Sequence, residues 1–308
     1  MALTDPAHFN RIIRLTLYRS GYVPLVIDCP RKGRKPSIEI TGNFYPNGNL
    51  PAFNVTVKNL YLTMKDQQYT RLQVEAGYDG NLVVFEGTIL SLYQEEPGPE
   101  GRTVIQCQAG TTETWINATI QMTHEAGTPL VVLLNQLQKK LGSYGVRTGT
   151  QARTLRLKTR FEYDGTVRGA IEKLKKLFAS SGLNIFMRGS YLVAVCQPGE
   201  DYINHHVLQF MSAPPQENAG GSEGTYYTTV TAPWMPELAC GDRLTIPSRI
   251  YIRNMKMVGS TDGKQDIQVQ SIAFHFGTTG GVNSMTVQGF LVRQNKKTGL
   301  SLPSWRLN

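Results

Sequence analysis

The chain has 308 residues, of which 40% are hydrophobic and 18% are charged. This length exceeds what one compact core usually holds, so two to four domains are expected, and the composition excludes a disordered chain or a coiled coil. The 32 Lys and Arg residues exceed the 23 Asp and Glu residues, giving a formal net charge of +9 that favours acidic partners without specifying one. No apolar run approaches the roughly 18–20 residues that cross a bilayer, so no membrane insertion is expected.

The N-terminal residues and the cysteines both indicate a cytosolic site of synthesis. Arg11 and Arg14 interrupt the first apolar stretch, which therefore lacks the uncharged core of a secretory signal. The cysteines lie far apart and form no C-x-x-C pair: Cys29, Cys107, Cys196 and Cys240. We expect them to be free and mostly buried, as in a reducing compartment.

The first 120 residues have the pattern of antiparallel strands. Apolar and polar residues alternate in residues 53–58 and 71–76, so each segment offers one face to a core and one to water. Residues 82–89 are more continuously apolar, which predicts a strand covered on both faces. Tight-turn sequences such as Asn47-Gly48 separate the strands. Residues 1–120 are therefore predicted to form a first β domain, a small barrel or sandwich.

Residues 121–212 change from the strand period to a helical one. Thr128 is the predicted N-cap of a first helix, Pro129 suits the first helical position, and Gly142 ends the helix. Five leucines recur at intervals of three and four and form one apolar stripe: Leu130, Leu133, Leu134, Leu137 and Leu141.

A second helix of the same design follows. Asp164 or Thr166 is its predicted N-cap, and Ser181-Gly182 is its predicted end. Its apolar stripe consists of Val167, Ala170, Ile171, Leu174, Leu177 and Phe178. Strand-like residues follow each helix, so the region contains two helix-plus-strand units. These units are either a duplicated α+β module or parts of one domain with two unrelated helices.

Residues 213–225 contain almost no large apolar side chain and several Gly and Pro residues, which predicts a linker or mobile loop. Strand patterns return in residues 226–308, the predicted second β domain, which ends in a C-terminal tail. The predicted fold class is therefore α+β and mainly β, with two antiparallel β-barrel or sandwich domains and two small α+β units inserted between them.

Patterns that resemble catalytic or metal sites are incomplete. Gly259–Gln265 departs from the phosphate-binding loop, with three rather than four residues between its glycines and Gln in place of Ser or Thr. His124-Glu125 lacks the second histidine of a zinc-protease helix. His205 and His206 could bind a metal with Cys196, but neighbouring strand residues point to opposite faces, so a surface pair in a loop is favoured. We predict no catalytic residue, no metal site and no cofactor.

Two further function classes stay open on these residues. Arg31–Lys35 is a dense basic stretch that could neutralise phosphates in a nucleic-acid-binding β-barrel, although a solvated loop or a contact to an acidic protein competes with that interpretation. A cell-wall hydrolase would need carboxylates in a cleft, and the candidates are Glu75, Glu86 and Glu113. Solvent-facing glutamates are ordinary on strands, so the chain is not expected to be an enzyme.

Several segments in order resemble the baseplate hub proteins of phage tails. Asn54–Leu60, Leu72–Tyr78 and Val84–Ile89 resemble the first barrel of these hubs, with two alternating strands, a turn and a returning strand. Thr231–Ile246 is similar to the hub segment in which a Gly-Asp turn leads into a strand. The paired helical units between them resemble the small α+β modules that hubs insert between their β parts.

The resemblance implies a homotrimer in which each chain supplies two tube-like β domains. Three chains would then form a pseudo-sixfold ring that joins the hexameric tail tube to the trimeric central spike. The implied partners are further copies of the chain, the tail tube or tube-initiator protein, the spike, the tape measure and other baseplate proteins. DNA would pass through the lumen without specific binding.

The implied location is the virion tail baseplate, after synthesis in the cytoplasm of the bacterial host. Arg31–Lys35 and the tail Asn295–Asn308, with Lys296, Lys297 and Trp305, are candidate contacts to baseplate proteins.

Overall fold

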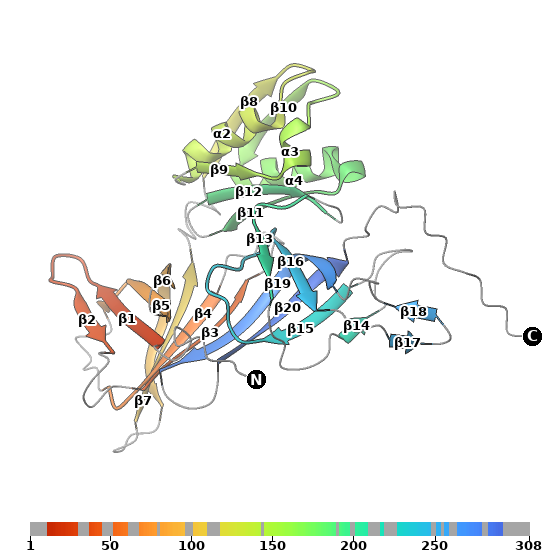
Figure 1. The fold of residues 1–308 in the computed structure, drawn as a ribbon. Helices are drawn as coiled ribbons and strands as arrows, with labels where there is room; N and C mark the ends of the chain where they lie inside the picture. Colours follow the sequence, from red (N-terminus) through yellow and green to blue (C-terminus); the bar gives the residue numbers. More distant parts are fainter. Residues whose placement is uncertain are drawn as a thin grey trace, which may run out of the picture.

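The structure is a computed structural model of the chain. It describes residues 11–29, 37–44, 52–60, 68–78, 81–95, 101–109, 118–142, 145–188, 191–197, 201–208, 216–218, 227–247, 251–253, 256–258, 264–278 and 283–291. The fold is α+β and mainly β, which confirms the predicted fold class (Figure 1). Within these ranges, no helix has the length and apolar character needed to span a bilayer.

The N-terminal part forms antiparallel strands, as the alternating pattern predicts. They are β1 (Arg11–Tyr18), β2 (Leu25–Asp28), β3 (Ile38–Phe44), β4 (Ala52–Lys58), β5 (Arg71–Tyr78), β6 (Asn81–Glu95) and β7 (Arg102–Ala109). The prediction that residues 82–89 are covered on both faces is wrong: Leu82 is 43% and Val84 is 54% exposed. These side chains point away from the core, whereas the next residue, Phe85, is buried, so β6 has one covered face.

The middle of the chain forms a separate α+β unit, which lies above the large sheet in Figure 1. Its elements are β8 (Thr119–His124), α2 (Leu130–Leu141), β9 (Gly145–Thr148), α3 (Thr150–Thr154), β10 (Phe161–Thr166), α4 (Val167–Leu177), the 3-10 helix η3 (Ala179–Ser181), β11 (Leu183–Arg188) and β12 (Tyr191–Cys196). β8 pairs with β10, and β12 lies between β11 and β9. Both long helices pack into one hydrophobic core with these strands.

The ends of the two long helices are set by local hydrogen bonds. Pro129, not Thr128, occupies the N-cap of α2, because the Thr128 hydroxyl donates backwards to the Glu125 carbonyl at 2.7 Å. Gly142 ends α2 in the left-handed conformation, with φ of 64°, as predicted. The amide of Gly169 donates to Thr166 Oγ1 at 3.1 Å, so Thr166 is the N-cap of α4.

Strands return after the α+β unit. They are β13 (His205–Val207), β14 (Gln216–Asn218), β15 (Tyr227–Ala232), β16 (Arg243–Pro247), β17 (Tyr251–Arg253), β18 (Lys256–Val258), β19 (Lys264–Gly277) and β20 (Asn283–Leu291). β14 lies inside the segment predicted as a linker or loop, because its backbone pairs with β15. β19 also pairs with β3, so the N-terminal and C-terminal strands belong to one sheet of 13 strands.

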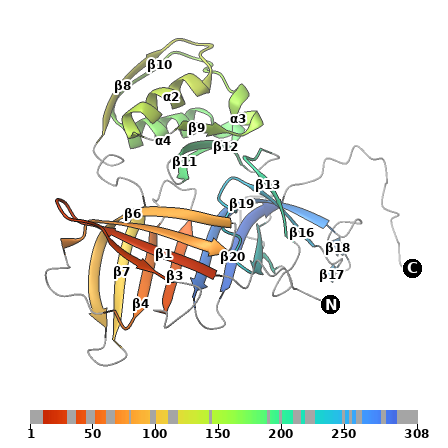
Figure 2. The same cartoon turned by 60° about the vertical axis from the view of Figure 1, so that its left-hand side comes forward.

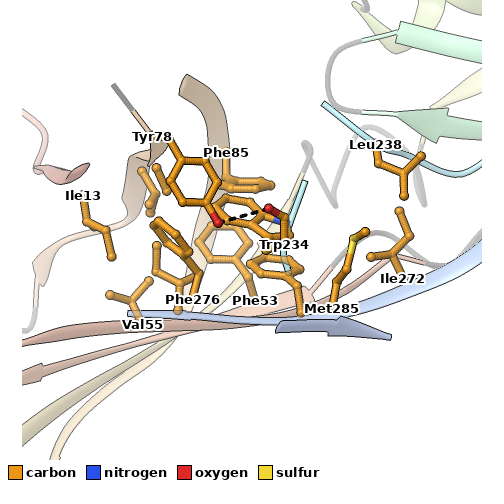
Figure 3. Close-up of a cluster of buried hydrophobic side chains, with 14 of the residues drawn as sticks. Ile13, Phe53, Val55, Tyr78, Phe85, Trp234, Leu238, Ile272, Phe276 and Met285 are labelled. Carbon is orange, nitrogen blue, oxygen red and sulfur yellow. Dashed lines mark hydrogen bonds between the residues drawn. The ribbon is translucent and has the colours of Figure 1, made fainter. Parts of the chain in front are cut away.

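One aromatic cluster forms the centre of the core on one face of this sheet (Figure 3). The Phe274 ring stacks on Trp234, Phe85 and Phe44, with ring centroids 5.1, 5.6 and 5.3 Å apart. The Tyr78 hydroxyl donates to the Trp234 carbonyl at 3.2 Å. Each aromatic pair contributes about 0.5–1.5 kcal/mol beyond the burial of its area. Because Phe44 and Phe85 lie on N-terminal strands and Phe274 lies on β19, the cluster holds both parts of the chain in one core.

Gly42→Val should lower the free energy of unfolding by about 1–3 kcal/mol, because the added side chain overlaps the Phe274 ring that covers Gly42. Chemical denaturation measures the change. Thr41→Ala is the matched control, since Thr41 lies on the same strand and is exposed, and should shift stability by less than about 0.5 kcal/mol. Equal losses in the two variants would contradict this account of the packing.

Candidate functional site

The sheet contains the same arrangement of strands twice. In one half the order is β3-β4-β7-β6, and β5 pairs with the first part of β6. In the other half the order is β14-β15-β20-β19, and β16 pairs with the first part of β19. The strands also follow one another along the chain in the same sequence in both halves. The two halves are therefore topological equivalents, joined side by side where β19 meets β3 (Figure 2).

A bulge occurs at the matching point of the longest strand in each half. The register shifts between Ile89 and Ser91 in β6, and between Val269 and Ser271 in β19. Bulges bend a strand and increase its twist. This bend lets the first part of each long strand pair with a different neighbour from the second part.

The same side-chain hydrogen bond follows each bulge. Ser91 Oγ donates to Gln106 Oε1 at 2.6 Å, and Ser271 Oγ donates to Gln288 Oε1 at 3.2 Å. In both halves the serine lies directly after the bulge and the glutamine lies opposite it on the next strand. This repeated pair fixes which residues of the two halves correspond.

The outward face of the central strands is almost uncharged. On β15, β20, β19, β3, β4 and β7 the positions that alternate with the buried residues are Thr229, Thr231, Ser284, Thr286, Gln288, Ser271, Ala273, His275, Thr41, Asn43, Ala52, Asn54, Thr56, Gln106 and Gln108. Charged side chains occur at one end of this face, where Glu39 lies 3.7 Å from Lys58 and 3.5 Å from His275, and where the exposed Arg102 on β7 lies opposite Lys58. We call these outward positions the neutral face.

Beyond the neutral face, the outward side of β1 and β5 is charged. Arg14 lies 2.8 Å from Asp28 and 3.6 Å from Glu75. Arg71 lies 2.9 Å from Glu86. Solvent-exposed ion pairs of this kind contribute about 0–1 kcal/mol each. The candidate hydrolase residues Glu75 and Glu86 are thus partners of arginines on an outer strand surface, and Glu113 lies outside the described residues.

The α+β unit is joined to the sheet through a buried carboxylate, Asp242. Its side chain has no exposed surface and lies 2.6 Å from Arg188 Nη1, at the end of β11, and 3.2 Å from His206 Nε2. The backbone amides of Asn204 and Ala239 also donate to it, at 3.0 and 3.1 Å. A buried charge is tolerated only when it is paired and hydrogen-bonded, so Asp242 holds three chain segments together. We call this contact between the α+β unit and the sheet the joint.

A second buried carboxylate strengthens the same joint. Asp201 accepts hydrogen bonds from the amides of Gln151, Ala152 and Cys196 at 2.8, 3.0 and 2.9 Å, which holds the start of α3 against β12. Gln268 on β19 donates to the Cys196 carbonyl at 3.1 Å and to the Asp201 carbonyl. The sheet therefore contacts the α+β unit through backbone atoms as well as side chains.

Asp266 on β19 has a lowered pKa. Burial raises the pKa of this carboxyl, but hydrogen bonds from Arg243 and Thr245, together with the positive charge of Arg243, outweigh burial and lower it. A carboxyl whose pKa is lower in the folded state stabilises the fold above its unfolded pKa of about 3.9. That contribution is lost as the pH falls through the folded-state pKa.

The two adjacent histidines do not converge on one site. His205 Nε2 lies 2.7 Å from Thr245 Oγ1, whereas His206 contacts Asp242, so both belong to β13 and to the joint rather than to a loop. Cys196 is buried, and burial raises the pKa of its thiol to about 12. No group of His, Cys, Asp and Glu able to hold a metal occurs among the described residues.

The remaining sequence candidates are structural or lie outside the described ranges. His124 Nε2 lies 2.8 Å from Gln136 Oε1, and Glu125 lies 3.5 Å from Arg160. Arg31–Lys35 and Asn295–Asn308 are outside the described residues, as are residues 259–263 of the incomplete phosphate loop. The four cysteines are buried thiols that form no disulfide with one another, as expected.

One sequence pattern partly indicated this contact between the sheet and the α+β unit. The Gly241-Asp242 turn does lead directly into β16, as the segment Thr231–Ile246 predicts. Nothing in the local pattern identified Asp242 as buried, because its partner Arg188 is 54 residues away in the chain.

Arg188→Met should cost about 3–5 kcal/mol of stability, because it leaves the buried Asp242 carboxylate without its main partner. Chemical denaturation measures the loss. Arg160→Met is the control: its ion pair with Glu162 is exposed, with side chains 57% and 61% accessible, and should cost less than about 1 kcal/mol. Similar small losses in both variants would show that the Asp242 pair does not hold the joint.

Asp266→Asn should lower the melting temperature at neutral pH, and the gap from the parent chain should narrow as the pH falls below about 4. The reason is that the parent loses the stabilising charge of Asp266 on protonation, whereas the amide carries no charge at any pH. Thermal melts between pH 7 and pH 3 measure the gap. A gap that stays constant over this range would contradict the lowered pKa.

No protein-family model and no curated protein sequence matches this chain. Solved structures do share its fold. A tail protein from Neisseria meningitidis has 9% identity and a TM-score of 0.55, covering 91% of this chain and 96% of its own. The 43 kDa tail protein of prophage MuSo2 from Shewanella oneidensis has 10% identity and a TM-score of 0.57, covering 91% and 99%.

An Escherichia coli protein described as a component of the type VI secretion system, with structural similarity to the T4 bacteriophage tail proteins gp27 and gp5, has 8% identity and a TM-score of 0.56. The match covers 86% of this chain and 76% of that protein. At such identities the likeness concerns the fold, and it extends over most of the chain. The chain therefore shares its fold with these tail proteins and with this type VI secretion component, in agreement with the sequence resemblance.

Proposed function

We propose that the chain is a structural baseplate hub of a phage tail or a related injection machine. Three copies form a pseudo-sixfold ring that joins the hexameric tail tube to the trimeric central spike. The observation that carries the proposal is the repeated strand arrangement, β3-β4-β7-β6 and β14-β15-β20-β19, within one continuous sheet. Two equivalent halves in each chain let three chains present six similar surfaces.

The repeat within each chain lets a ring of threefold symmetry match a tube of six subunits. A closed ring with three identical chains has threefold symmetry, and a tube of six subunits can be matched only if each chain offers two similar contacts. The proposed domain plan has a tube-like β domain in residues 1–120, the α+β units in residues 121–212 and a second tube-like β domain in residues 226–308. Residues 213–225 connect the last two and also supply β14, the first strand of the second half of the sheet.

The neutral face suits the lining of the channel. Hydroxyl and amide groups of residues such as Thr41, Asn54, Thr286 and Gln288 offer no fixed charge to a passing polyanion. DNA could therefore move past this face without the phosphate neutralisation that produces tight binding. Passage through the lumen without specific binding is the behaviour we propose.

The described residues favour this assembly role over the two alternatives. A nucleic-acid-binding surface needs clustered Lys and Arg, whereas the neutral face has charges at one end only. A hydrolase needs a carboxylate with a raised pKa in a cleft, whereas Glu75 and Glu86 pair with arginines on an outer surface. We therefore propose no enzymatic activity and no cofactor, with the virion tail baseplate as the location.

Mass measurement under native conditions, with the chain alone and mixed with a tail-tube protein, tests the proposal. We expect the mass of three chains, and a larger complex on mixing, because the ring offers six contacts to the tube. A single chain in both samples, or a closed ring of an even number of chains, would contradict the proposal.

The same samples separate the alternatives. Filter binding of DNA over a salt series should show weak retention; tight binding that falls steeply with salt would instead support the nucleic-acid-binding module. Clearing of a peptidoglycan suspension by the purified chain would support the hydrolase.

A further inference from the structure

The junction between the two halves of the sheet is a model for a contact between chains. Within one chain the second part of β19 pairs antiparallel with β3, from Ile272 opposite Phe44 to Gly277 opposite Glu39. In the repeated arrangement, β19 is the last strand of one half and β3 is the first strand of the other. The equivalent last and first strands are β6 and β14.

Both equivalent strands have an open edge. β5 pairs with β6 only as far as Thr88, and the amide of Ile89 donates to the Thr70 carbonyl at 2.9 Å. Beyond that point, no strand in the described part of the chain pairs with the side of β6 opposite β7. β14 likewise pairs with β15 on one side, and with no other strand among the described residues.

The exposure of β6 differs from that of β19 at the same stage of the strand. Ile272 and Phe274 on β19 are 2% and 4% exposed. At the equivalent positions of β6, Leu92 is partly exposed and Gln94 is exposed. Leu90 in the bulge and Tyr93 on the outward face are 61% and 39% exposed. Large apolar side chains beside an open strand edge are the feature that proteins normally avoid unless another strand covers them.

The repeated Ser–Gln pair sets the register of the missing contact. This pair makes Ser91 equivalent to Ser271, and therefore Tyr93 equivalent to Ala273. Following the strands across from Gln106 and from Gln288 leads to equivalent positions on β4 and β15, and then on β3 and β14. By this path Thr41 is equivalent to Gln216. Two residues further along each strand, Asn43 is therefore equivalent to Asn218.

We propose that β6 of one chain pairs antiparallel with β14 of the next chain, and that Tyr93 lies opposite Asn218 of the neighbouring copy, as Ala273 lies opposite Asn43 within the chain. Gln94 and Glu95 then lie opposite Glu217 and Gln216 of that copy. The inference rests on the proposed ring of chains and names the surface that closes it. The occupant of both edges is a second copy of this chain.

Another open edge of the sheet, β2, does not fit this role. β2 pairs with β1 at the far end of the strand order, and among the described residues the half containing β14 has no strand that corresponds to it. A contact made by β2 would therefore not repeat the junction seen inside the chain. It serves as a comparison edge in the test.

The junction between chains lacks one stabilising feature of the junction within the chain. Phe274, which stacks in the aromatic cluster and covers Gly42, is replaced at the equivalent position of β6 by Gln94. The contact between chains therefore depends on backbone pairing and on the exposed apolar residues of β6. We expect it to form reversibly, whereas the internal junction forms as part of folding.

Disulfide formation between two single-cysteine variants tests the register. Tyr93→Cys chains mixed with Asn218→Cys chains should form covalent dimers of unlike chains on mild oxidation. Gln94→Cys mixed with Asn218→Cys is the matched control, and should react at least about tenfold more slowly, because a slip of one residue puts the thiols on opposite faces of the sheet.

The natural cysteines do not confuse the readout. All four are buried, and burial raises the pKa of Cys107, Cys196 and Cys240 to about 12, so these three stay protonated. The double variant Asn43→Cys/Ala273→Cys is the positive control, because those residues lie opposite each other in one chain and should form an intrachain disulfide.

Amide hydrogen exchange provides a readout that needs no substitution. Exchange at Leu92–Glu95 should slow in the assembled protein relative to dilute single chains, whereas Leu25–Asp28 on β2 should exchange equally in both. Protection of the β2 edge instead of β6 would overturn the proposed pairing.

The outcomes distinguish the register from the ring. If the mass is that of three chains and the internal control closes, but Tyr93→Cys and Asn218→Cys do not react faster than the slipped pair, the register is wrong and the ring stands. If the protein remains a single chain at every concentration, both proposals fail. Rapid Tyr93–Asn218 bonding with protection of β6 supports both.

Discussion

Backbone pairing between β3 and β19 is the constraint on which the architecture depends. The two strands lie more than two hundred residues apart in the chain, and their hydrogen bonds make one sheet out of two sets of strands. The Phe274 ring, which lies over Gly42 and stacks on Trp234, fixes this pairing from the core side. Without the pairing of β3 with β19, the two halves would have separate edges and no common face.

The α+β unit depends on a different kind of contact. Its own core is complete, with both long helices packed among its strands. It meets the sheet through the buried charges around Asp242 and through a small apolar cluster that includes Phe186 and Cys240. Buried ionic joints specify one geometry because a misplaced charge has no partner, so the unit is held at a defined position rather than tethered.

Local patterns were enough to predict much of the fold. The five leucines of α2 and the alternation in β4 and β5 report directly which face is buried, so these elements follow from the sequence. The cap at Thr128 was predicted wrongly, because a hydroxyl can bond backwards as well as forwards. The β3–β19 junction and the Asp242 joint could not be predicted, because both pair residues that are distant in the chain.

In the part of the chain that the structure describes, the α+β unit occurs once, whereas the strand arrangement occurs twice. In a ring of three chains the sheet would therefore repeat every 60°, while the protruding units would repeat every 120° (Figure 1). The ring of three chains would thus have two rotational periods on different parts of its surface. A partner with sixfold order and a partner with threefold order could each find a matching pattern without any subunit changing shape.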